Sequence, residues 1–486
     1  MDNIDSPMRR RWLRRTLAAG AAGLGAQALS APALAANSVS SAIPSAAPLA
    51  GSVPARALVI RGAHVLSMDP TLGEQRDCDV LIHGSRIMAV GAKLVAGEAT
   101  EIDGRGKILL PGLVDAHWHM WNSLGRNSGP AQDGGAFFPT IVALGARYTP
   151  EIAQLAVRLS AAQARRAGVT TLNNWSHNLR SPEFADAEYG AMVASGLRGR
   201  FWYGYPQDLA ADATMDLPAV IQWQRSVSQQ RESRIDLGMA VRGPERTPEA
   251  VWRKEFETAR ELKLPISAHV AVTRALQQQH RAIARLAELD LLRPGVQLVH
   301  ATHASDEDFQ RIAAAGATVC LTPITEMRVG YGFPPIPALL RAKVRLSLGI
   351  DTTVLAGSAN PYAGMQAALN VAAASAHDEL ALRAEDVLYW ATQGGADEMG
   401  WGDRIGSVTP GKQADLVLID AGHPDLAPVT YAAAAVVQSA SPAAVTHVIA
   451  NGRVHEAGAM QAELRELSAQ AAAVWPGLAV QPAPRT

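Results

Sequence analysis

Residues 111–119 read Pro111-Gly112-Leu113-Val114-Asp115-Ala116-His117-Trp118-His119, an apolar run that ends in two histidines. On an extended segment, side chains two residues apart point to the same side. Both imidazoles can therefore reach a single metal ion, and imidazole is a common ligand of divalent metals. This run predicts a β-strand that carries a pair of metal ligands at its end.

Downstream of this run, short β-like segments alternate with helical stretches. With 109–114 counted as the first, the β-like segments are 109–114, 168–172, 199–203, 235–241, 264–268, 297–299, 317–321 and 345–348. Helical stretches at 150–167, 248–262, 274–292 and 305–315 separate them. Eight strands with intervening helices predict an α/β fold, a closed (β/α)8 TIM-type barrel over residues 111–403.

The two flanks of this region have a different sequence pattern, in which short segments of alternating apolar and polar residues are separated by frequent turn signals. They cover residues 55–110 and 404–460. Asn451-Gly452 lies between two β-like runs there, which is a strong hairpin signal. We expect both flanks to combine into one small β-sandwich, followed by a C-terminal extension over 461–486.

Ligand-type residues also occur at three further strand ends. His269 ends the fifth predicted strand, His300 the sixth, and Asp351 the eighth. In such a barrel the active site lies at the carboxyl ends of the strands. A single histidine at a strand end is more often a hydrogen-bonded structural residue. Five ligand-type residues at four strand ends are hard to attribute to chance, so the sequence predicts a metal site.

These residues make the sequence similar to the amidohydrolase superfamily. The nearest branch contains cytosine deaminase, guanine deaminase and the s-triazine hydrolases. The resemblance covers about residues 56–455. Its motifs are the run 111–119, Gly168-Val169-Thr170-Thr171, His269, His300 and Gly349-Ile350-Asp351.

The resemblance implies one divalent metal ion. The ligands that it implies are His117, His119, His269 and Asp351. His300 would lie beside the ion and hydrogen-bond the bound water or the substrate. Zinc is preferred and iron is the alternative, because histidine and carboxylate ligands suit both. Binuclear relatives carry a carboxylated lysine at the end of strand 4, whereas the segment 237–241 contains no lysine. The resemblance also suggests a homo-oligomer.

The chemistry of such a site follows from its ligands. Zinc or ferrous iron lowers the pKa of bound water to about 7, which gives hydroxide at neutral pH. Asp351 would accept the proton of that water and later pass it to the leaving group. His300 or the metal would stabilise the developing oxyanion. Asp351 and His300 are therefore candidate catalytic residues, and Glu326 is the third.

Two positions depart from the pattern of the relatives. In the deaminases of this branch, a glutamate three residues after the strand 5 histidine protonates the ring nitrogen, and this position is Val272 here. A valine cannot deliver a proton, which puts simple aminoazine deamination in doubt. Glu326 stands where an asparagine is common. It either replaces the missing acid or forms an ion pair with Arg328 or another cation.

Loops at the barrel mouth supply the candidates for substrate binding. Trp121 and Trp175 either form a wall for an aromatic or heterocyclic substrate or pack beneath a lid. His177 contacts the substrate or supports the site if it faces the cavity. Arg242 either orients a carbonyl or carboxylate or pairs with Glu245. The candidate substrate-binding residues are Trp121, Trp175, His177, Arg242 and His303.

Three functions remain open at this point. The leading hypothesis is hydrolysis of a C–N bond in an amide, urea, carbamate or ring-attached amine of a small cyclic or aromatic substrate. The first alternative is an aminoheterocycle deaminase in which Glu326 supplies the acid, and stoichiometric ammonia release would identify it. The second alternative is a periplasmic binding protein without turnover. The intact ligand set argues against it, because a binding protein has no need of Asp351.

Composition restricts the partners. The chain has 44 basic and 45 acidic residues, so no basic field is available to attract nucleic acid or an anionic membrane. Hydrophobic residues make up 48%, which suits a globular enzyme with a small-molecule substrate. Cys78 and Cys320 are the only cysteines. We expect two buried, unpaired thiols rather than a disulfide.

The N-terminus resembles an export signal over residues 1–35. Arg9-Arg10-Arg11-Trp12-Leu13-Arg14 precedes a weakly apolar stretch, and Ala33-Leu34-Ala35 offers a small-residue cleavage site. The basic run resembles a twin-arginine signal. The apolar stretch is too short to span a bilayer stably. We therefore expect the twin-arginine export machinery as a partner, a linker over 36–54, and a periplasmic or secreted enzyme without membrane insertion after cleavage.

Overall fold

The computed structural model describes residues 57–128, 136–229 and 234–478. The expected signal peptide and linker, over 1–35 and 36–54, lie outside the described residues. Within the three ranges, none of the helices has both the length and the apolar character needed to cross a membrane.

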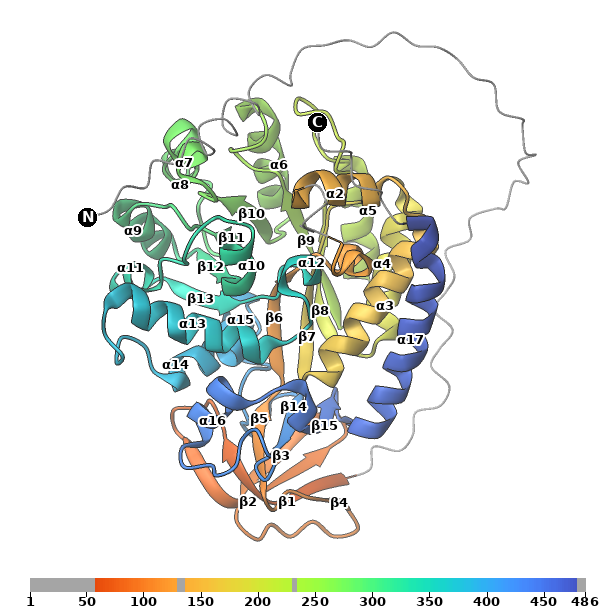
Figure 1. The fold of residues 1–486 in the computed structure, drawn as a ribbon, viewed down its shortest axis with the longest axis vertical. Helices are drawn as coiled ribbons and strands as arrows, with labels where there is room; N and C mark the ends of the chain where they lie inside the picture. The colour runs from red at the N-terminus through yellow and green to blue at the C-terminus, as the bar shows by residue number, and fades with distance from the viewer. Residues whose placement is uncertain (1–56, 129–135, 230–233, 479–486) are drawn as a thin grey trace, which may run out of the picture. The chain divides into compact units, whose positions relative to one another are not determined.

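Eight parallel strands form the barrel and confirm the expected α/β fold class (Figure 1). Strands that are neighbours in the barrel follow one another in the chain, as (β/α) units require. The strands are β6 (Leu113–Trp118), β7 (Val169–Ser176), β8 (Arg198–Tyr203), β9 (Ile235–Val241), β10 (Ile266–Val270), β11 (Val296–His300), β12 (Thr318–Leu321) and β13 (Arg345–Leu348). Every residue of β6, β7 and β8 is buried, as expected for strands covered on both faces.

Helices connect and cover these strands (Figure 1). Those before β11 are α2 (Phe137–Gly145), α3 (Pro150–Arg166), α4 (Pro182–Ala194), α5 (Leu217–Ser228), α6 (Glu249–Glu261), α7 (Arg274–His280) and α8 (Ala282–Glu288). Those after it are α9 (Asp306–Ala315), α10 (Pro323–Arg328), α11 (Ile336–Arg341), α12 (Thr353–Ala356), α13 (Pro361–Ala376), α14 (Ala384–Tyr389) and α15 (Gly395–Glu398). The single helix predicted over 274–292 is wrong. Arg281 has a left-handed φ of 45°, and it divides the stretch into α7 and α8.

The first and last barrel strands meet at the predicted ligand residues. The backbone N–H of Asp351 donates to the carbonyl of His117 at 2.7 Å, and the N–H of His119 donates to the carbonyl of Asp351 at 2.6 Å. Gly349 permits this approach, because a Cβ there would lie 2.6 Å from the carbonyl oxygen of His117. The same backbone contact thus joins the two edges and brings three of the expected ligands together.

The predicted first barrel strand, 109–114, is wrong in its bounds. Residues Lys107–Pro111 form β5 of a second sheet, and the barrel strand β6 begins at Leu113. Gly112 marks the crossing between the two sheets. A Cβ at this position would lie 2.1 Å from Oγ1 of Thr170, so only glycine fits. The apolar run is continuous in sequence, and the change of sheet depends on this tertiary contact.

Strands from both flanks make up the second sheet. Its order is β16-β15-β14-β5-β1-β2-β3, and β4 pairs with β1. Antiparallel pairing of β5 with β14 joins the flanks, with Leu110 opposite Val417. The strands are β1 (Ala57–Leu66), β2 (Glu74–His83), β3 (Arg86–Gly91), β4 (Thr100–Asp103), β14 (Leu416–Asp420), β15 (Val445–Ala450) and β16 (Arg453–Glu456).

The hairpin expected at Asn451-Gly452 is confirmed. These two residues connect β15 to β16 with φ values of 52° and 75°, as a type I′ turn requires. Two helices follow the strands of this flank, α16 (Ala432–Ser439) and α17 (Ala457–Leu478). Helix α17 lies along α3, and Arg165 forms an ion pair with Glu463 (Figure 1). Cys78 and Cys320 are buried and unpaired, as expected.

Candidate metal centre

Four side chains converge at the carboxyl end of the barrel. Ligand atoms of His117, His119, His269 and Asp351 all lie within 4.8 Å of one another. His117 and His119 come from the end of β6, His269 from β10, and Asp351 from the segment after β13. Stretches that are far apart in the sequence therefore supply one compact cluster.

The spacing within the cluster fits a single ion. Nε2 of His117 lies 3.2 Å from Nε2 of His119 and 3.2 Å from Nε2 of His269. Oδ1 of Asp351 lies 3.5 Å and 3.3 Å from Nε2 of His117 and of His119. Tetrahedral ligands bound at about 2.0–2.1 Å are about 3.3–3.4 Å apart. The four separations given are close to this value, so the four residues fit the ligand shell of one divalent metal ion.

Hydrogen bonding and burial favour the ligand form of these side chains. Nδ1 of His119 lies 3.1 Å from the carbonyl oxygen of Trp175, which fixes the proton on Nδ1 and leaves Nε2 with a lone pair. Burial lowers the pKa of His117 to about 3 and the pKa of His269 well below its usual range. Neutral imidazoles result at physiological pH, and only neutral imidazole binds a metal.

Asp351 is held as a carboxylate. Burial by itself raises its pKa, but the contacts with His117 and His119 outweigh burial and hold the pKa well below its usual range. The backbone of Asp351 has a φ of 63°, and His300 has a φ of 73°. Such values cost energy for non-glycine residues and cluster at functional sites, where the surrounding fold enforces them.

His300 lies beside the cluster, and its ring forms a hydrogen bond with the side chain of Glu326. Its Nδ1 is 3.1 Å from Oε1 of Glu326, and the backbone N–H of Thr322 donates to the same oxygen at 2.9 Å. Glu326 is completely buried and does not line the cavity. Its partner is therefore His300, and the expected pair with Arg328 does not form.

A cavity of about 200 Å³ opens above the cluster. His119, His269, His300 and Asp351 line one part of it. Of the predicted substrate-binding residues, Trp175, His177 and Arg242 line the cavity, whereas Trp121 and His303 do not. Asp351 is the only carboxylate among the described residues that line it.

Trp121 forms a hydrogen bond with His177. Its indole N–H donates to Nδ1 of His177 at 3.0 Å, so Nε2 carries the proton of the neutral ring. Nε2 in turn lies 2.9 Å from the side-chain amide nitrogen of Gln207, and it can donate to this amide when the amide is turned to present its oxygen. Trp121 is fully buried and does not line the cavity, which fits the alternative of a packing role. His303 is likewise turned away, with Nε2 2.7 Å from the carbonyl oxygen of Tyr331.

Arg242 has a role that neither sequence interpretation foresaw. Its guanidinium donates to the carbonyls of Leu209, at 3.0 Å, of Ala210, at 2.8 Å, and of Ala213. It does not pair with Glu245, whose carboxylate instead accepts from the backbone N–H of Ala271. Arg242 therefore holds the loop after β8 in place, and most of its donors are already used.

Several cavity residues were missed from the sequence. Tyr205 and Gln207 follow β8, and the rule that active sites lie at carboxyl strand ends could have found them. Phe138 lies on α2, a helix that the sequence analysis did not predict. Arg246 and Tyr331 belong to loops without a distinctive pattern. Val272 is buried in the segment after β10 and does not line the cavity.

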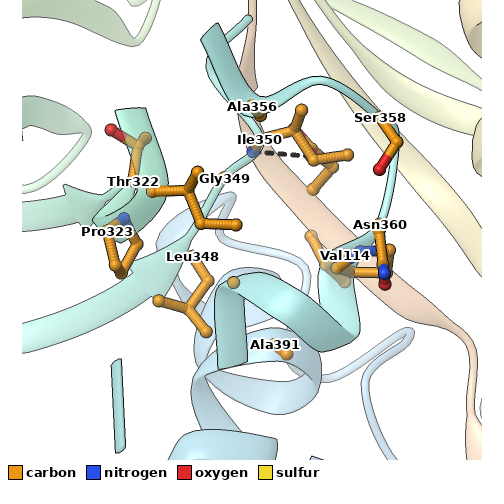
Figure 2. Close-up of a pocket in the computed structure, with 14 residues that line it drawn as sticks. Val114, Thr322, Pro323, Leu348, Gly349, Ile350, Ala356, Ser358, Asn360 and Ala391 are labelled. Carbon is orange, nitrogen blue, oxygen red and sulfur yellow. Dashed lines mark hydrogen bonds between the residues drawn. The ribbon is translucent and has the colours of Figure 1, made fainter. Parts of the chain in front are cut away.

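A second, smaller cavity lies beside the segment that follows β13 (Figure 2). Figure 2 shows the run Leu348, Gly349 and Ile350 passing it, with Thr322 and Pro323 on one side and Ser358 and Asn360 on the other. Its volume of about 30 Å³ has room for about two water molecules. This space is too small for an organic substrate, so the larger cavity above the ligands is the candidate active site.

Comparisons with known proteins agree with this geometry. The family model described as "Amidohydrolase family" matches residues 108–455. The 5-methylthioadenosine/S-adenosylhomocysteine deaminase of Pelotomaculum thermopropionicum is 28% identical over 408 residues, which cover 82% of this chain and 92% of the relative. The 5'-deoxyadenosine deaminase of Methanosarcina mazei is 26% identical, with coverage of 82% and 92%.

Solved structures show the same fold. An adenosine deaminase from Xanthomonas campestris, with bound zinc, is 25% identical with a TM-score of 0.75, and the match covers 86% of this chain and 99% of that one. The atrazine chlorohydrolase of Arthrobacter aurescens, complexed with zinc, is 21% identical with a TM-score of 0.75 and the same coverage. The second likeness concerns the fold alone.

Proposed function

The chain belongs to the amidohydrolase family and is a hydrolytic enzyme, and from this premise we propose that it cleaves a C–N bond of a small cyclic or aromatic substrate with the help of one divalent metal ion. The observation that carries this proposal is the convergence of three imidazoles and one carboxylate within 4.8 Å, with His119, His269 and Asp351 in the lining of the cavity. Aromatic side chains line the same cavity, among them Phe138, Trp175 and Tyr331. A planar substrate can pack against such a wall.

The metal ligands would be His117, His119, His269 and Asp351. Zinc is the preferred ion, which is supported by the zinc in the Xanthomonas campestris adenosine deaminase, and iron is the alternative. A divalent ion bound here supplies Lewis-acid polarisation and makes water a better nucleophile at neutral pH. The remaining chemistry belongs to the side chains around it.

Asp351 would move the proton. It lines the cavity and is ionised, and it is the only carboxylate among the described lining residues, so it is the group there that can accept a proton. Its carboxylate accepts one proton from the attacking water as the oxygen adds to a trigonal carbon. The same carboxyl group then delivers this proton to the leaving nitrogen, so that the amine departs neutral. The proton that Asp351 takes from water is therefore the one that it gives to the leaving nitrogen, and no second acid or base is needed.

His300 would stabilise the negative charge that develops on the substrate oxygen. Because Nδ1 is bound to Glu326, Nε2 is the ring nitrogen left for the cavity. A proton on Nε2 can be donated to the oxyanion, and the buried carboxylate of Glu326 stabilises the charged ring. Glu326 is therefore a positioning residue, because it acts through His300 and does not touch the substrate.

Deamination of an aminoheterocycle is the second candidate, favoured by the names of the two deaminases that the sequence resembles. This reaction needs an acid for the ring nitrogen. Val272 occupies the expected position of that acid, and Glu326 is turned away from the cavity. Asp351 alone would have to supply every proton. For this reason we prefer an amide, urea or carbamate to a ring-attached amine.

Elemental analysis of the purified protein, coupled to a mass-spectrometric screen, tests the proposal. We expect about one zinc or iron per chain and turnover of an amide, urea or carbamate to an amine. Stoichiometric ammonia from an aminoheterocycle would identify the deaminase instead. His269→Ala serves as the matched control, since it removes one ligand. Full activity in a metal-free preparation would overturn the proposal.

We also propose that the enzyme is exported. The arginine-rich run at residues 9–14 and the small residues at 33–35 support a twin-arginine signal. Replacement of Arg9, Arg10 and Arg11 by lysine should trap the enzyme in the cytoplasm, as measured by fractionation and immunoblotting. Unchanged distribution of this variant would contradict the proposal.

A further inference from the structure

Arg246 lies on the wall of the cavity, in the segment between β9 and α6. Its side chain is exposed, and its guanidinium carbon lies 5.8 Å from the ring centroid of Phe138. A guanidinium stacked on an aromatic face keeps its in-plane N–H donors free for another group. Arg246 thus combines a restrained side chain with unused donors.

The positive charge of Arg246 acts on other residues of the cavity. Burial raises the pKa of the Tyr205 and Tyr331 hydroxyls, and the charge of Arg246 opposes this effect on both. Both tyrosines line the cavity. Arg246 is therefore part of the same electrostatic environment as the prospective substrate.

No acid neutralises Arg246 within the described part of the chain. None of its carboxylates lies within 4.0 Å of this guanidinium. The adjacent Glu245 is the obvious candidate, but its carboxylate accepts from the backbone N–H of Ala271. Asp351 belongs to the metal-ligand cluster. Glu245 and Asp351 thus have partners other than Arg246.

The charge of the cavity wall also favours an anionic group on the substrate. The lining includes the charged side chains of Arg242, Arg246 and Asp351. The wall is positive even before a divalent cation is counted. Nη1 and Nη2 of Arg242 already donate to backbone carbonyls, whereas no side-chain hydrogen bond engages the guanidinium of Arg246 among the described residues, which makes Arg246 the better cation for an anionic group. Low-dielectric walls strengthen such an attraction.

We propose that the substrate carries a carboxylate and that Arg246 binds it on the wall of the cavity. A planar carboxylate matches the guanidinium fork with two parallel hydrogen bonds. A phosphate monoester would call for further cations or amide donors, whereas a single free guanidinium suits a singly charged, planar anion. This inference rests on the proposed C–N hydrolase function and names the class of substrate within it.

Paired probes test the inference on the zinc-loaded enzyme. N-benzoylglycine and its methyl ester contain the same amide bond and differ in one negative charge. We expect kcat/KM to be about 10-fold or more higher for the acid. Arg246→Gln should raise KM for the acid by about 10- to 100-fold. The same substitution should change kcat/KM for the ester much less than for the acid, so that the acid-to-ester ratio falls.

Two further variants sharpen the result. Arg246→Lys should retain part of the preference, because the charge remains while the two-bond geometry is lost. Arg253→Gln on α6 removes an exposed arginine that pairs with Glu257 and should leave the preference intact. An acid-to-ester ratio that is unchanged in Arg246→Gln would overturn the inference.

Failure of the C–N hydrolase proposal can be distinguished from failure of the inference about Arg246. If the zinc-loaded enzyme turns over neither probe, thermal stabilisation by N-benzoylglycine decides the matter. Stabilisation of the wild type that is lost in Arg246→Gln supports carboxylate recognition, even though the hydrolase proposal then loses support. Equal stabilisation of both proteins, or none of the wild type, overturns the inference about Arg246.

Discussion

Nδ1 of His300 lies 3.1 Å from Oε1 of Glu326, a carboxylate with no exposed surface. The two residues come from different strand-to-helix connections, His300 from the end of β11 and Glu326 from α10. A buried carboxylate beside Nδ1 fixes the proton on that nitrogen and so sets the orientation of the ring. The pair thereby determines what His300 presents to the cavity.

Substitution Glu326→Gln should lower kcat by about 10- to 100-fold with unchanged metal content, because the amide cannot stabilise a charged His300. Steady-state kinetics and elemental analysis measure the two quantities. The effect should fall mainly on kcat, since Glu326 does not line the cavity. Arg328→Gln is the control, because this exposed residue is not the partner of Glu326. Unchanged kcat/KM in Glu326→Gln would exclude the positioning role.

Asp351→Asn should lower kcat by about 100- to 10,000-fold, the usual range for loss of a general acid–base group. The three imidazoles remain and the amide oxygen can still approach the ion, so the variant should keep its metal. Elemental analysis alongside turnover measurements separates proton transfer from metal binding. Near-wild-type turnover would remove Asp351 from the proton-transfer role.

Removal of the metal should both inactivate and destabilise the enzyme. Histidines and a carboxylate that are packed together without a cation lose the attraction that holds them, and a ligand present at 100 times its Kd contributes about 2.7 kcal/mol to the free energy of unfolding. A chelator should therefore lower Tm and activity together, and added zinc should restore both. His269→Ala should behave like the chelated protein and gain little from zinc. A chelated protein with the original Tm and activity would contradict this prediction.

Local patterns were sufficient to predict much of the barrel. The bounds of β9 and β13 agree with the segments 235–241 and 345–348, and the hairpin at 451–452 forms as expected. Each of these features depends on neighbouring residues alone. The ligand cluster was also accessible from sequence, because all four residues stand at or just beyond strand ends, which the barrel brings to one side.

Features that depend on contacts between distant segments were not accessible. The chain passes from one sheet to the other at Gly112, where Thr170 leaves no space for a Cβ, and the apolar run around this position does not indicate the change. Trp121 and Arg242 are residue types that often bind substrates, yet one supports His177 and the other a loop backbone. Residue type indicates what a side chain can do, while its direction is decided by packing.

Glu188 gives the last prediction, which concerns stability against pH. This residue of α4 is fully buried, and its Oε2 accepts from the side chains of Asn174, at 2.9 Å, and Ser176, at 2.7 Å. Burial raises its pKa from 4.5 to about 7, although both hydrogen bonds oppose the rise. Between these two pH values the folded protein binds one proton more than the unfolded chain. The contribution of Glu188 to the free energy of unfolding is therefore complete below pH 4.5 and falls by about 3 kcal/mol as the pH rises through 7.

Glu188→Gln isolates this effect, because the amide is neutral at every pH and its oxygen can still accept from Asn174 and Ser176. Urea unfolding at a series of pH values measures the free energy of unfolding of both proteins. The value for the variant minus the value for the wild type should rise from pH 4.5 to 7 and stay constant above pH 7. Glu261→Gln, at an exposed position on α6, should follow the wild-type curve. Parallel curves for Glu188→Gln and the wild type would mean that Glu188 is ionised in the folded protein, and its burial would then have to be offset by a cation or a water molecule at its second oxygen.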